Sequence, residues 1–266
     1  MHTGISAGVL FTFGLFFGSF INALVWRLRN KKSIARGRSI CPKCKHQLKA
    51  LDLLPVLSWL LLKGKCRYCK KPISVQYPIV ELVTAVLFLL VFLDWQFITL
   101  SSYLLLAIWL GIAVVLTALA VYDLRWMLLP NKLIEILLYL ALIQLFMMLI
   151  LGELILVAKA LFAAVLGGGF FYLLFAYSKG KWMGGGDVKL VFTMGLLLGL
   201  SKLAVALMVA FNSGAIIGML LLASKKYTKK SLMPFGPFLI LGVVIAQLYG
   251  NEIINWYLGL FTLSGV

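Results

Sequence analysis

Acidic residues are scarce in this sequence. Asp and Glu account for 8 of the 266 residues, and only 12% of the chain is charged, whereas 63% is hydrophobic. A soluble domain of this length needs far more polar surface to stay dispersed in water. The composition therefore excludes an ordinary soluble globular protein and favours a protein embedded in a lipid bilayer.

Segments typical of several other protein classes are also missing. The first apolar run begins at Gly4 without a basic flank before it, so we interpret it as a permanent helix rather than a cleaved signal peptide. No phosphate-binding loop and no soluble nucleotide-binding fold is evident. The basic residues fit a membrane boundary better than a nucleic-acid surface, and no nucleic-acid partner is expected.

Long apolar runs dominate the rest of the chain. Several are about 18 residues or longer, enough to cross about 30 Å of hydrocarbon as a helix. We expect an all-α polytopic membrane protein with about eight transmembrane helices. The predicted spans are 4–26, 76–93, 101–122, 133–151, 154–177, 187–200, 203–223 and 235–257. They suggest an N-terminal part, 1–100, that carries a loop at 27–75, and a six-helix core, 101–266.

Basic residues fall almost entirely on one side of the predicted membrane. The net charge is +17, and the loops 27–75, 123–132, 178–186 and 224–234, with Lys189 at the edge of its span, hold 23 of the 25 Lys and Arg. Only Lys159 and Lys202 remain for the other side. Because basic loops stay in the cytoplasm, this asymmetry predicts that these loops are cytoplasmic and that both termini are outside.

Cysteine occurs only four times, and always in the 27–75 loop. The residues form two C-x-x-C pairs, Cys41 with Cys44 and Cys66 with Cys69, separated by 21 residues. Four thiolates in this pattern suit tetrahedral Zn²⁺, and a loop too short and polar to hold its own core needs such a staple. We therefore expect a structural zinc ion. Redox chemistry by the two dithiols is the alternative.

Two aspartates stand at cytoplasmic ends of predicted spans. Asp123 ends the third span, and Asp187 begins the sixth, directly after Gly184-Gly185-Gly186. An ionisable group at membrane depth is a functional candidate. Two carboxylates brought together share a proton, so that one acts as a base on water and the other as an acid on a carbonyl. The pair therefore predicts an aspartyl protease.

The residues around Asp187 support this interpretation. Three successive glycines do not form a stable helix interior, and they allow another chain to approach the backbone closely. A substrate that lies extended beside Asp187 needs such access, so Gly184 and Gly186 are candidate backbone contacts. Lys189 either keeps one carboxylate ionised or marks the positive side of the membrane, and both interpretations stay open.

Several motifs together resemble those of one family. Gly184-x-Gly186-Asp187-x-Lys189 resembles the Gly-x-Gly-Asp motif of intramembrane-type aspartyl proteases. Asp123, six residues before Leu129-Pro130, looks like the first aspartate motif of type IV prepilin peptidases. Three further segments are similar to that family's pattern: Gly18-Ser19-Phe20-Ile21-Asn22, Tyr77-Pro78-Ile79-Val80-Glu81-Leu82 and Pro234-Phe235-Gly236-Pro237-Phe238. Two positions depart from it: Leu129 replaces the usual Ile before Pro, and Arg29 stands where Pro is frequent.

The resemblance covers nearly the whole chain and implies an activity. Such enzymes lie in the bacterial cytoplasmic membrane and remove the short basic leader of prepilins or pseudopilins at its cytoplasmic face, commonly between Gly and a Phe-like residue. Asp123 and Asp187 would be the catalytic pair. Many members then methylate the new N-terminal amine with S-adenosylmethionine, and the four-cysteine loop is associated with this bifunctional form. Membrane lipid is the other expected partner, and the motifs do not set the oligomeric state.

Three residues are weak candidates for the cofactor site. Glu81, about one turn inside the second span, either pairs with a Lys or Arg at the helix end or contacts the amine of S-adenosylmethionine or of the mature pilin. Gly18 and Asn22 either line a site or pack helices. Two other functions remain as alternatives, namely a membrane thiol oxidoreductase that uses the cysteine pairs and an ion-coupled transporter with a path through Glu81 or Asp187.

Overall fold

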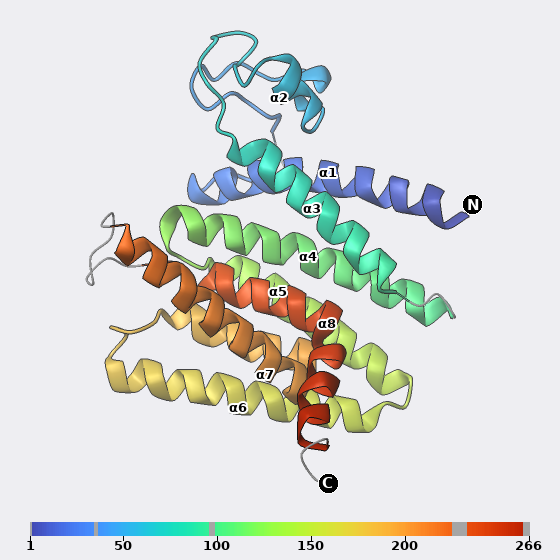
Figure 1. Cartoon of the computed structure of the whole chain (residues 1–266). Helices are drawn as coiled ribbons and strands as arrows, with labels where there is room; N and C mark the ends of the chain where they lie inside the picture. Colours follow the sequence, from blue (N-terminus) through green and yellow to red (C-terminus); the bar gives the residue numbers. More distant parts are fainter. Residues whose placement is uncertain (1, 35–36, 96–98, 225–232, 263–266) are drawn as a thin grey trace. The chain divides into compact units, whose positions relative to one another are not determined.

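The computed structural model describes residues 2–34, 37–95, 99–224 and 233–262. Every regular element in these ranges is helical, as Figure 1 shows. The elements are α1 (His2–Arg29), η1 (Ala50–Leu53), α2 (Leu57–Leu61), α3 (Gln76–Leu93), α4 (Leu100–Trp126), α5 (Asn131–Ile150), α6 (Leu154–Ser178), α7 (Gly185–Ala223) and α8 (Gly236–Thr262). The expected all-α fold is confirmed.

Within the described ranges, seven helices are long and apolar enough to cross a membrane, and the chain is a multi-pass membrane protein. The expected count of eight differs because α7 is one element of 39 residues. A straight helix of that length would extend about 58 Å, nearly twice the hydrocarbon thickness. However, α7 is interrupted at Gly199, with φ 69° and ψ 178°, so its two halves correspond to the predicted spans 187–200 and 203–223.

A side chain of α5 forms a hydrogen bond with the backbone of α7 at its interruption. A φ of 69° is strained for residues other than glycine, so Gly199 permits the break. Backbone carbonyls freed by a break need partners inside the protein, because hydrocarbon supplies none. The buried side chain of Gln144 supplies one, since its Nε2 donates a hydrogen bond to the carbonyl of Leu197 at 3.1 Å.

The chain divides into two compact units, Met1–Val121 and Tyr122–Val266. In the first unit α1 packs along α3, and a Cβ atom placed on Gly18 would collide with the Cα of Glu81. In the second unit α7 packs against α6 and α8 and also contacts α5, while the last turn of α4 contributes Asp123. The division expected at residue 100 stays a prediction.

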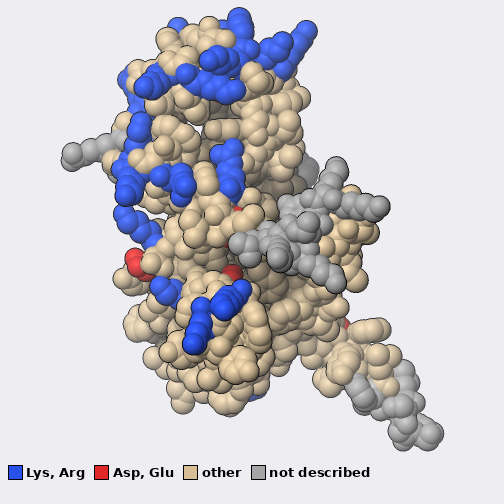
Figure 2. Space-filling view, turned by 90° about the vertical axis from the view of Figure 1, so that its left-hand side faces the viewer, with Lys and Arg blue, Asp and Glu red and all other residues tan. Residues whose placement is uncertain are grey.

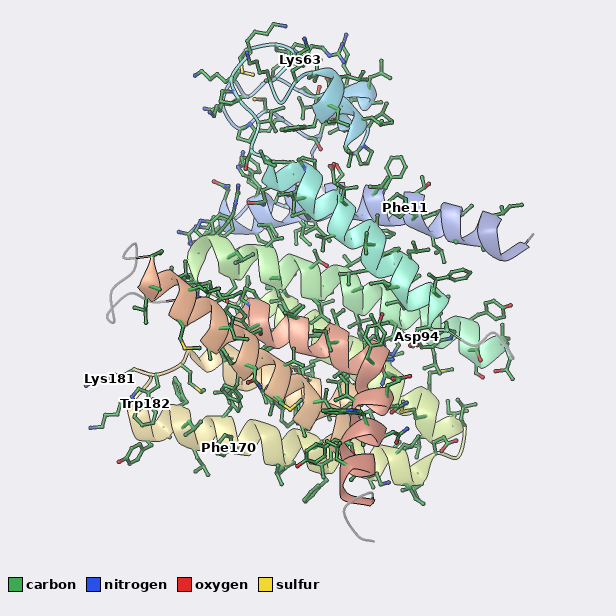
Figure 3. All side chains as sticks on the ribbon, viewed as in Figure 1. Phe11, Lys63, Asp94, Phe170, Lys181 and Trp182 are labelled. Carbon is green, nitrogen blue, oxygen red and sulfur yellow. The ribbon has the colours of Figure 1, made fainter. Side chains whose placement is uncertain are left out.

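Charged and aromatic side chains mark the ends of the helices. Figure 2 shows Lys and Arg side chains spread over the segment before α3 that holds the four cysteines, residues 37–75, at the top of the view. We call it the four-cysteine segment. Lys181 and Trp182 project from the loop before α7 (Figure 3), and 68% of Trp182 is exposed. Basic and aromatic residues of this kind are typical of a membrane–water boundary. Five basic residues of the predicted charge asymmetry lie outside the described residues: Arg36, Lys225, Lys226, Lys229 and Lys230.

Candidate active site and metal centre

Asp187 is buried in the first turn of α7. Gly184, in extended conformation just before the helix, donates its backbone N–H to Oδ2 of Asp187 at 3.1 Å. In return, the backbone N–H of Asp187 donates to the carbonyl of Gly184 at 3.1 Å. This reciprocal pair fixes the carboxylate at a helix N-terminus, where the helix dipole favours negative charge. Gly185 and Gly186 belong to the first helical turn, so α7 begins slightly earlier than predicted.

Asp123 is held by a different element, the start of α8. It lies in the last turn of α4 and is 4% exposed. Gly236, the first residue of α8, donates its backbone N–H to Oδ2 of Asp123 at 3.0 Å. A Cβ atom on Gly236 would lie 2.6 Å from the same oxygen, so only glycine allows this approach. Each carboxylate is therefore held by a backbone N–H at the beginning of a helix.

The fold brings the two aspartates together within the second unit. They come from segments 64 residues apart, yet Leu129 packs both beside Gly186, which precedes Asp187, and beside Gly236, which holds Asp123. Two buried carboxylates in this relation can share one proton, which makes them an acid and a base that act together on a carbonyl and a water. The arrangement is suited to hydrolysis without a covalent intermediate.

Gly236 contributes to this site, although its motif alone predicts no role for it. The available signal was its position between an apolar residue and Pro237 at the start of a predicted span, because proline is common in the first turn of a helix. A helix that begins at such a point presents free backbone N–H groups to a nearby carboxylate.

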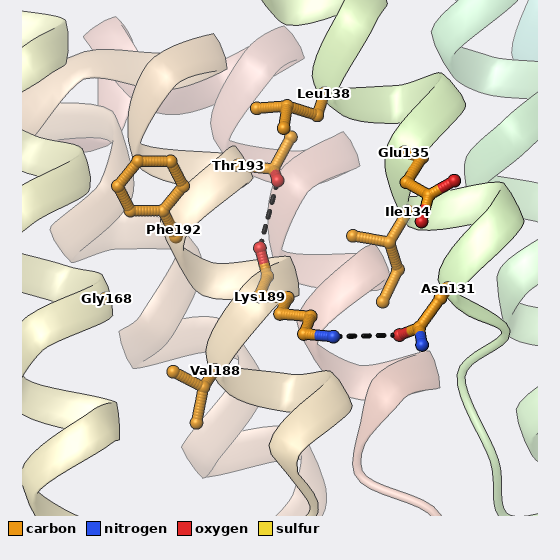
Figure 4. A pocket seen from close by; sticks show the side chains of 9 residues that line it. All are labelled: Asn131, Ile134, Glu135, Leu138, Gly168, Val188, Lys189, Phe192 and Thr193. Atoms are coloured by element: carbon orange, nitrogen blue, oxygen red, sulfur yellow. Dashed lines mark hydrogen bonds between the residues drawn. The ribbon is translucent and has the colours of Figure 1, made fainter.

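Lys189 lies beside a cavity of about 380 Å³ between α5, α6 and α7 (Figure 4). Its Nζ donates to Oδ1 of Asn131, the first residue of α5, at 2.9 Å. Glu135 lies on the wall of the same cavity. The other lining groups are mostly apolar, and they include Ile134, Leu138, Val188 and Phe192. The hydrogen-bond partner of Lys189 is thus the side-chain amide of Asn131 on α5.

The four cysteines converge in the first unit. Their Sγ atoms all lie within 4.8 Å of one another, and all four residues are free thiols: Cys41, Cys44, Cys66 and Cys69. Zinc–sulfur bonds of about 2.3 Å in a tetrahedron place the sulfurs about 3.8 Å apart. The cluster therefore fits a four-thiolate metal site without rearrangement of the chain.

Each C-x-x-C pair adopts the same turn. Lys45 donates its backbone N–H to the carbonyl of Cys41 at 2.8 Å, and Lys70 donates in the same way to Cys66 at 2.9 Å. Both lysines have positive φ, 60° and 56°. Both cysteine pairs therefore present their sulfurs from the same kind of turn.

The pKa values of the two thiols in one pair, Cys41 and Cys44, are shifted in opposite directions. Burial would raise the pKa of Cys41, but backbone hydrogen bonds at Cys44 and Lys43 outweigh it and lower the pKa to about 7. A backbone hydrogen bond at His46 lowers the pKa of Cys44, whereas desolvation and the neighbouring thiols raise it, to about 11 overall. The two thiols thus resist losing their protons together, and a bound cation would offset this repulsion.

The three weak cofactor candidates hold the first unit together. Glu81 is 6% exposed and is hydrogen-bonded to the backbone N–H of Val56, at 2.6 Å, and to the side chain of Ser19 on α1, rather than to a Lys or Arg. The amide of Asn22 donates to the carbonyls of Gly18 and Tyr77, both at 3.2 Å. These contacts join α1, α3 and the segment between them.

The residue that Glu81 holds has an unusual backbone. Val56 has φ 61° and ψ −52°, and Leu57 donates its backbone N–H to the carbonyl of Pro55 at 2.5 Å. These values describe a γ-turn of the rare, strained kind, and a β-branched residue at positive φ is a genuine outlier. The buried carboxylate of Glu81 therefore stabilises a turn that the local sequence disfavours.

Comparisons with known proteins agree along the chain. Residues 12–95 match the bacterial peptidase A24 N-terminal domain, and residues 110–219 match the type IV leader peptidase family. The chain is 34% identical to the prepilin leader peptidase/N-methyltransferase of Bacillus subtilis over 94% of this chain and 97% of that protein. The proteins of the same name from Aeromonas hydrophila (35% identical, 94% and 93% covered) and Legionella pneumophila (34%, 93% and 92%) are similar. No solved structure matches.

Proposed function

The chain belongs to the type IV leader peptidase family, and we propose that it removes the leader of prepilins or pseudopilins with Asp123 and Asp187 as the catalytic pair. One observation carries the assignment of residues. Two buried carboxylates from distant segments lie in one part of the second unit, each held by the backbone N–H of a glycine at the start of a helix. Preorganised donors of this kind keep reacting groups in place.

The proposed reaction is direct hydrolysis of a peptide bond. One carboxylate, ionised, takes a proton from a water molecule as the water oxygen attacks the scissile carbonyl carbon. The other, protonated, gives its proton to the carbonyl oxygen. The tetrahedral intermediate then loses its C–N bond: the carboxyl that took the water proton gives it to the leaving amine, and the other carboxylate takes a proton back from a hydroxyl, which restores the starting state of the pair.

The substrate would lie along the start of α7. Gly184 has no side chain next to Asp187, so an extended peptide can approach the backbone there, whereas the space beside Gly186 is filled by Leu129. Lys189 and Asn131, on the wall of the cavity between α5, α6 and α7, would contact the same substrate. Because basic residues mark this end of the helices, we place the reaction at the cytoplasmic face of the bacterial inner membrane.

We also propose that the product is N-methylated, as the names of the relatives suggest. S-adenosylmethionine, when bound, supplies an electrophilic methyl group. In the first unit a cavity of about 390 Å³ lies between α1 and the four-cysteine segment, with Phe16, Phe20 and Arg27 on its wall. Aromatic rings suit an adenine, whereas the guanidinium of Arg27 is engaged by the carbonyls of Ile34 and Gly37, each at 2.7 Å. Binding of S-adenosylhomocysteine, lost in Phe20→Ala while leader cleavage persists, tests this assignment.

Zinc is proposed as a structural ion. The residues that would hold it are Cys41, Cys44, Cys66 and Cys69, whose sulfurs already lie at suitable distances. Four thiolates fill a tetrahedral shell and leave no open position for a substrate, so the ion would staple the four-cysteine segment and take no part in hydrolysis.

The decisive experiment is mass spectrometry of a prepilin incubated with the purified enzyme. We expect leader loss with wild type and none with Asp123→Asn or Asp187→Asn, because each amide preserves shape but cannot exchange the shared proton. Glu252→Gln, which changes an exposed acid of the same unit away from the cavity between α5, α6 and α7, is the matched control and should cleave normally. Leader retention by wild type, with a substrate that another family member processes, would overturn the proposal.

The two alternatives give different results in the same assay. A thiol oxidoreductase would lose its activity in Cys→Ser variants and keep it in both Asp→Asn variants. A transporter would show no proteolysis at all. The relatives' shared name favours neither alternative.

A further inference from the structure

One apolar side chain contacts the backbone next to both aspartates. Leu129 lies in the short connection between α4 and α5, three residues beyond the end of α4. A Cβ atom placed on Gly186 would lie 2.9 Å from Cβ of Leu129, and one placed on Gly236 would lie 3.2 Å from its Cδ2. The side chain of Leu129 is therefore packed between the first turn of α7 and the first residue of α8.

The two glycines are the backbone positions on which the carboxylates depend. Gly186 immediately precedes Asp187, and Gly236 donates its N–H to Asp123. A shift of either backbone relative to Leu129 would move one carboxylate relative to the other. Leu129 therefore packs against the backbone on which each carboxylate depends.

The connection that carries Leu129 is itself well fixed. Pro130, the N-cap of α5, has φ −66° and ψ 125°, and a following proline restricts the backbone of the residue before it. At the other end, Met127 donates its backbone N–H to the carbonyl of Asp123 at 2.8 Å. The neighbouring Leu128 points outward and is 55% exposed, whereas Leu129 is half-buried. The chain therefore directs one of two adjacent leucines into the site.

We propose that Leu129 is a positioning residue that sets the separation of the Asp123 and Asp187 carboxylates. The inference rests on the proposed function and deepens it. Sharing of one proton by two carboxylates depends steeply on their distance, and a displacement of about 1 Å at a catalytic group can cost about 10²-fold in rate. A leucine packed against two glycines is a stiff spacer, because protein interiors transmit small changes in volume.

The test compares kcat and KM for leader cleavage in three variants. Leu129→Ala should lower kcat at least about 10-fold and leave KM within about 3-fold, because the substrate still binds while the pair is misplaced. Leu129→Ile, which keeps the volume, should restore kcat to within about 3-fold of wild type. Leu128→Ala, which removes an exposed leucine next to it, is the matched control and should behave as wild type.

Several outcomes would overturn the proposal. One is a Leu129→Ala enzyme with the kcat of wild type; another is a change confined to KM or to the melting temperature in detergent, which ordinary packing would produce. An equal loss in Leu128→Ala would also overturn it. If Leu129→Ala does not fold, Leu129→Val replaces it, and a kcat that does not fall at an unchanged melting temperature refutes the inference. Failure of wild type to cleave would instead refute the proposed function.

Discussion

Gly236 donates its backbone N–H to Oδ2 of Asp123 across 3.0 Å, although 113 residues separate them in the chain. The contact uses the first N–H of a membrane helix, which has no partner inside that helix. It compensates a buried carboxylate for part of the water it has lost. It also ties the last turn of α4 to α8.

This contact predicts a large effect for the smallest possible substitution. In Gly236→Ala the new Cβ would lie 2.6 Å from the Asp123 oxygen, so either the carboxylate or the start of α8 must move. We expect kcat for leader cleavage to fall by about 10²-fold, as for other displacements at a reacting group. Steady-state cleavage of a prepilin, followed by mass spectrometry, measures it.

Gly169→Ala is the matched control for this prediction. Gly169 lies in the same unit, in the middle of α6, and a Cβ atom there would meet nothing within 4 Å. Cleavage by this variant should equal that of wild type. A similar loss in both variants would show that an added methyl group in these helices is harmful in general and that the contact with Asp123 has no special part.

The sequence predicts helix bounds that depend on apolar runs. It does not predict features that depend on contacts between the helices. It placed α3 at its observed bounds, 76–93, because an uninterrupted apolar run with polar flanks has only one way to cross a bilayer. It also predicts separate spans at 187–200 and 203–223, which correspond to the two halves of α7. It did not identify Gly199 as the break or Gln144 as the partner of a freed carbonyl, since both follow from packing of α5 on α7.

The same division holds at the candidate site. Asp123 and Asp187 stand out because acids are rare in the chain, and the topology puts them at one depth. Gly236 and Leu129 are a glycine and a leucine in a chain rich in both, and only the fold shows that they lie next to the two carboxylates. For Glu81 the sequence suggests a basic side chain as one possible partner, but in the structure its carboxylate accepts the backbone N–H of Val56, 25 residues earlier in the chain.

The four-cysteine cluster predicts one zinc ion per chain. Purified wild type should contain it by elemental mass spectrometry, and Cys41→Ser, which replaces a buried ligand, should lose it. Hydrogen exchange should then rise in residues 41–72, because the staple of that segment is gone. Asp187→Asn should keep its zinc. Stoichiometric zinc in Cys41→Ser, or none in wild type with its thiols reduced, would contradict the assignment.

Asp52 predicts an acid-sensitive four-cysteine segment. It accepts hydrogen bonds from Nε of Arg67 at 2.6 Å and from the hydroxyl of Tyr68 at 2.9 Å. Burial would raise the pKa of Asp52, but these donors outweigh it and lower the pKa below its usual range. A carboxyl group with a lowered pKa stabilises the fold above the unfolded value, about 3.9, and this stabilisation is lost as pH falls through the folded value.

Hydrogen exchange as a function of pH checks this expectation. Corrected for intrinsic rates, exchange in residues 49–68 should increase in wild type as pH falls below about 4. In Asp52→Asn it should be raised already at pH 7 and should change less on acidification, since the group that titrates is gone. Zinc release in acid is common to both proteins, so their difference isolates Asp52. Parallel pH profiles for the two proteins would contradict the prediction.

The turn at Val56 predicts a rescue by a second substitution. Glu81→Met removes the acceptor of the Val56 N–H while it keeps the length of the side chain, so the strained turn should open and exchange in residues 54–60 should rise. Strain of this kind amounts to about 1–3 kcal/mol and is absent for glycine, which adopts positive φ freely. Val56→Gly in the Glu81→Met background should therefore restore much of the protection.

Comparing Glu81→Met with the double variant Glu81→Met/Val56→Gly separates the role of Glu81 in this turn from the general cost of losing a buried acid. If Glu81 served mainly to pack α3 against α1, the loss of protection would be the same with Val or Gly at position 56, because that packing does not involve the turn. Glu135→Met, at an exposed acid of the second unit, should leave residues 54–60 unchanged. Rescue only in the double variant would establish that Glu81 acts by holding the backbone of Val56 in its γ-turn.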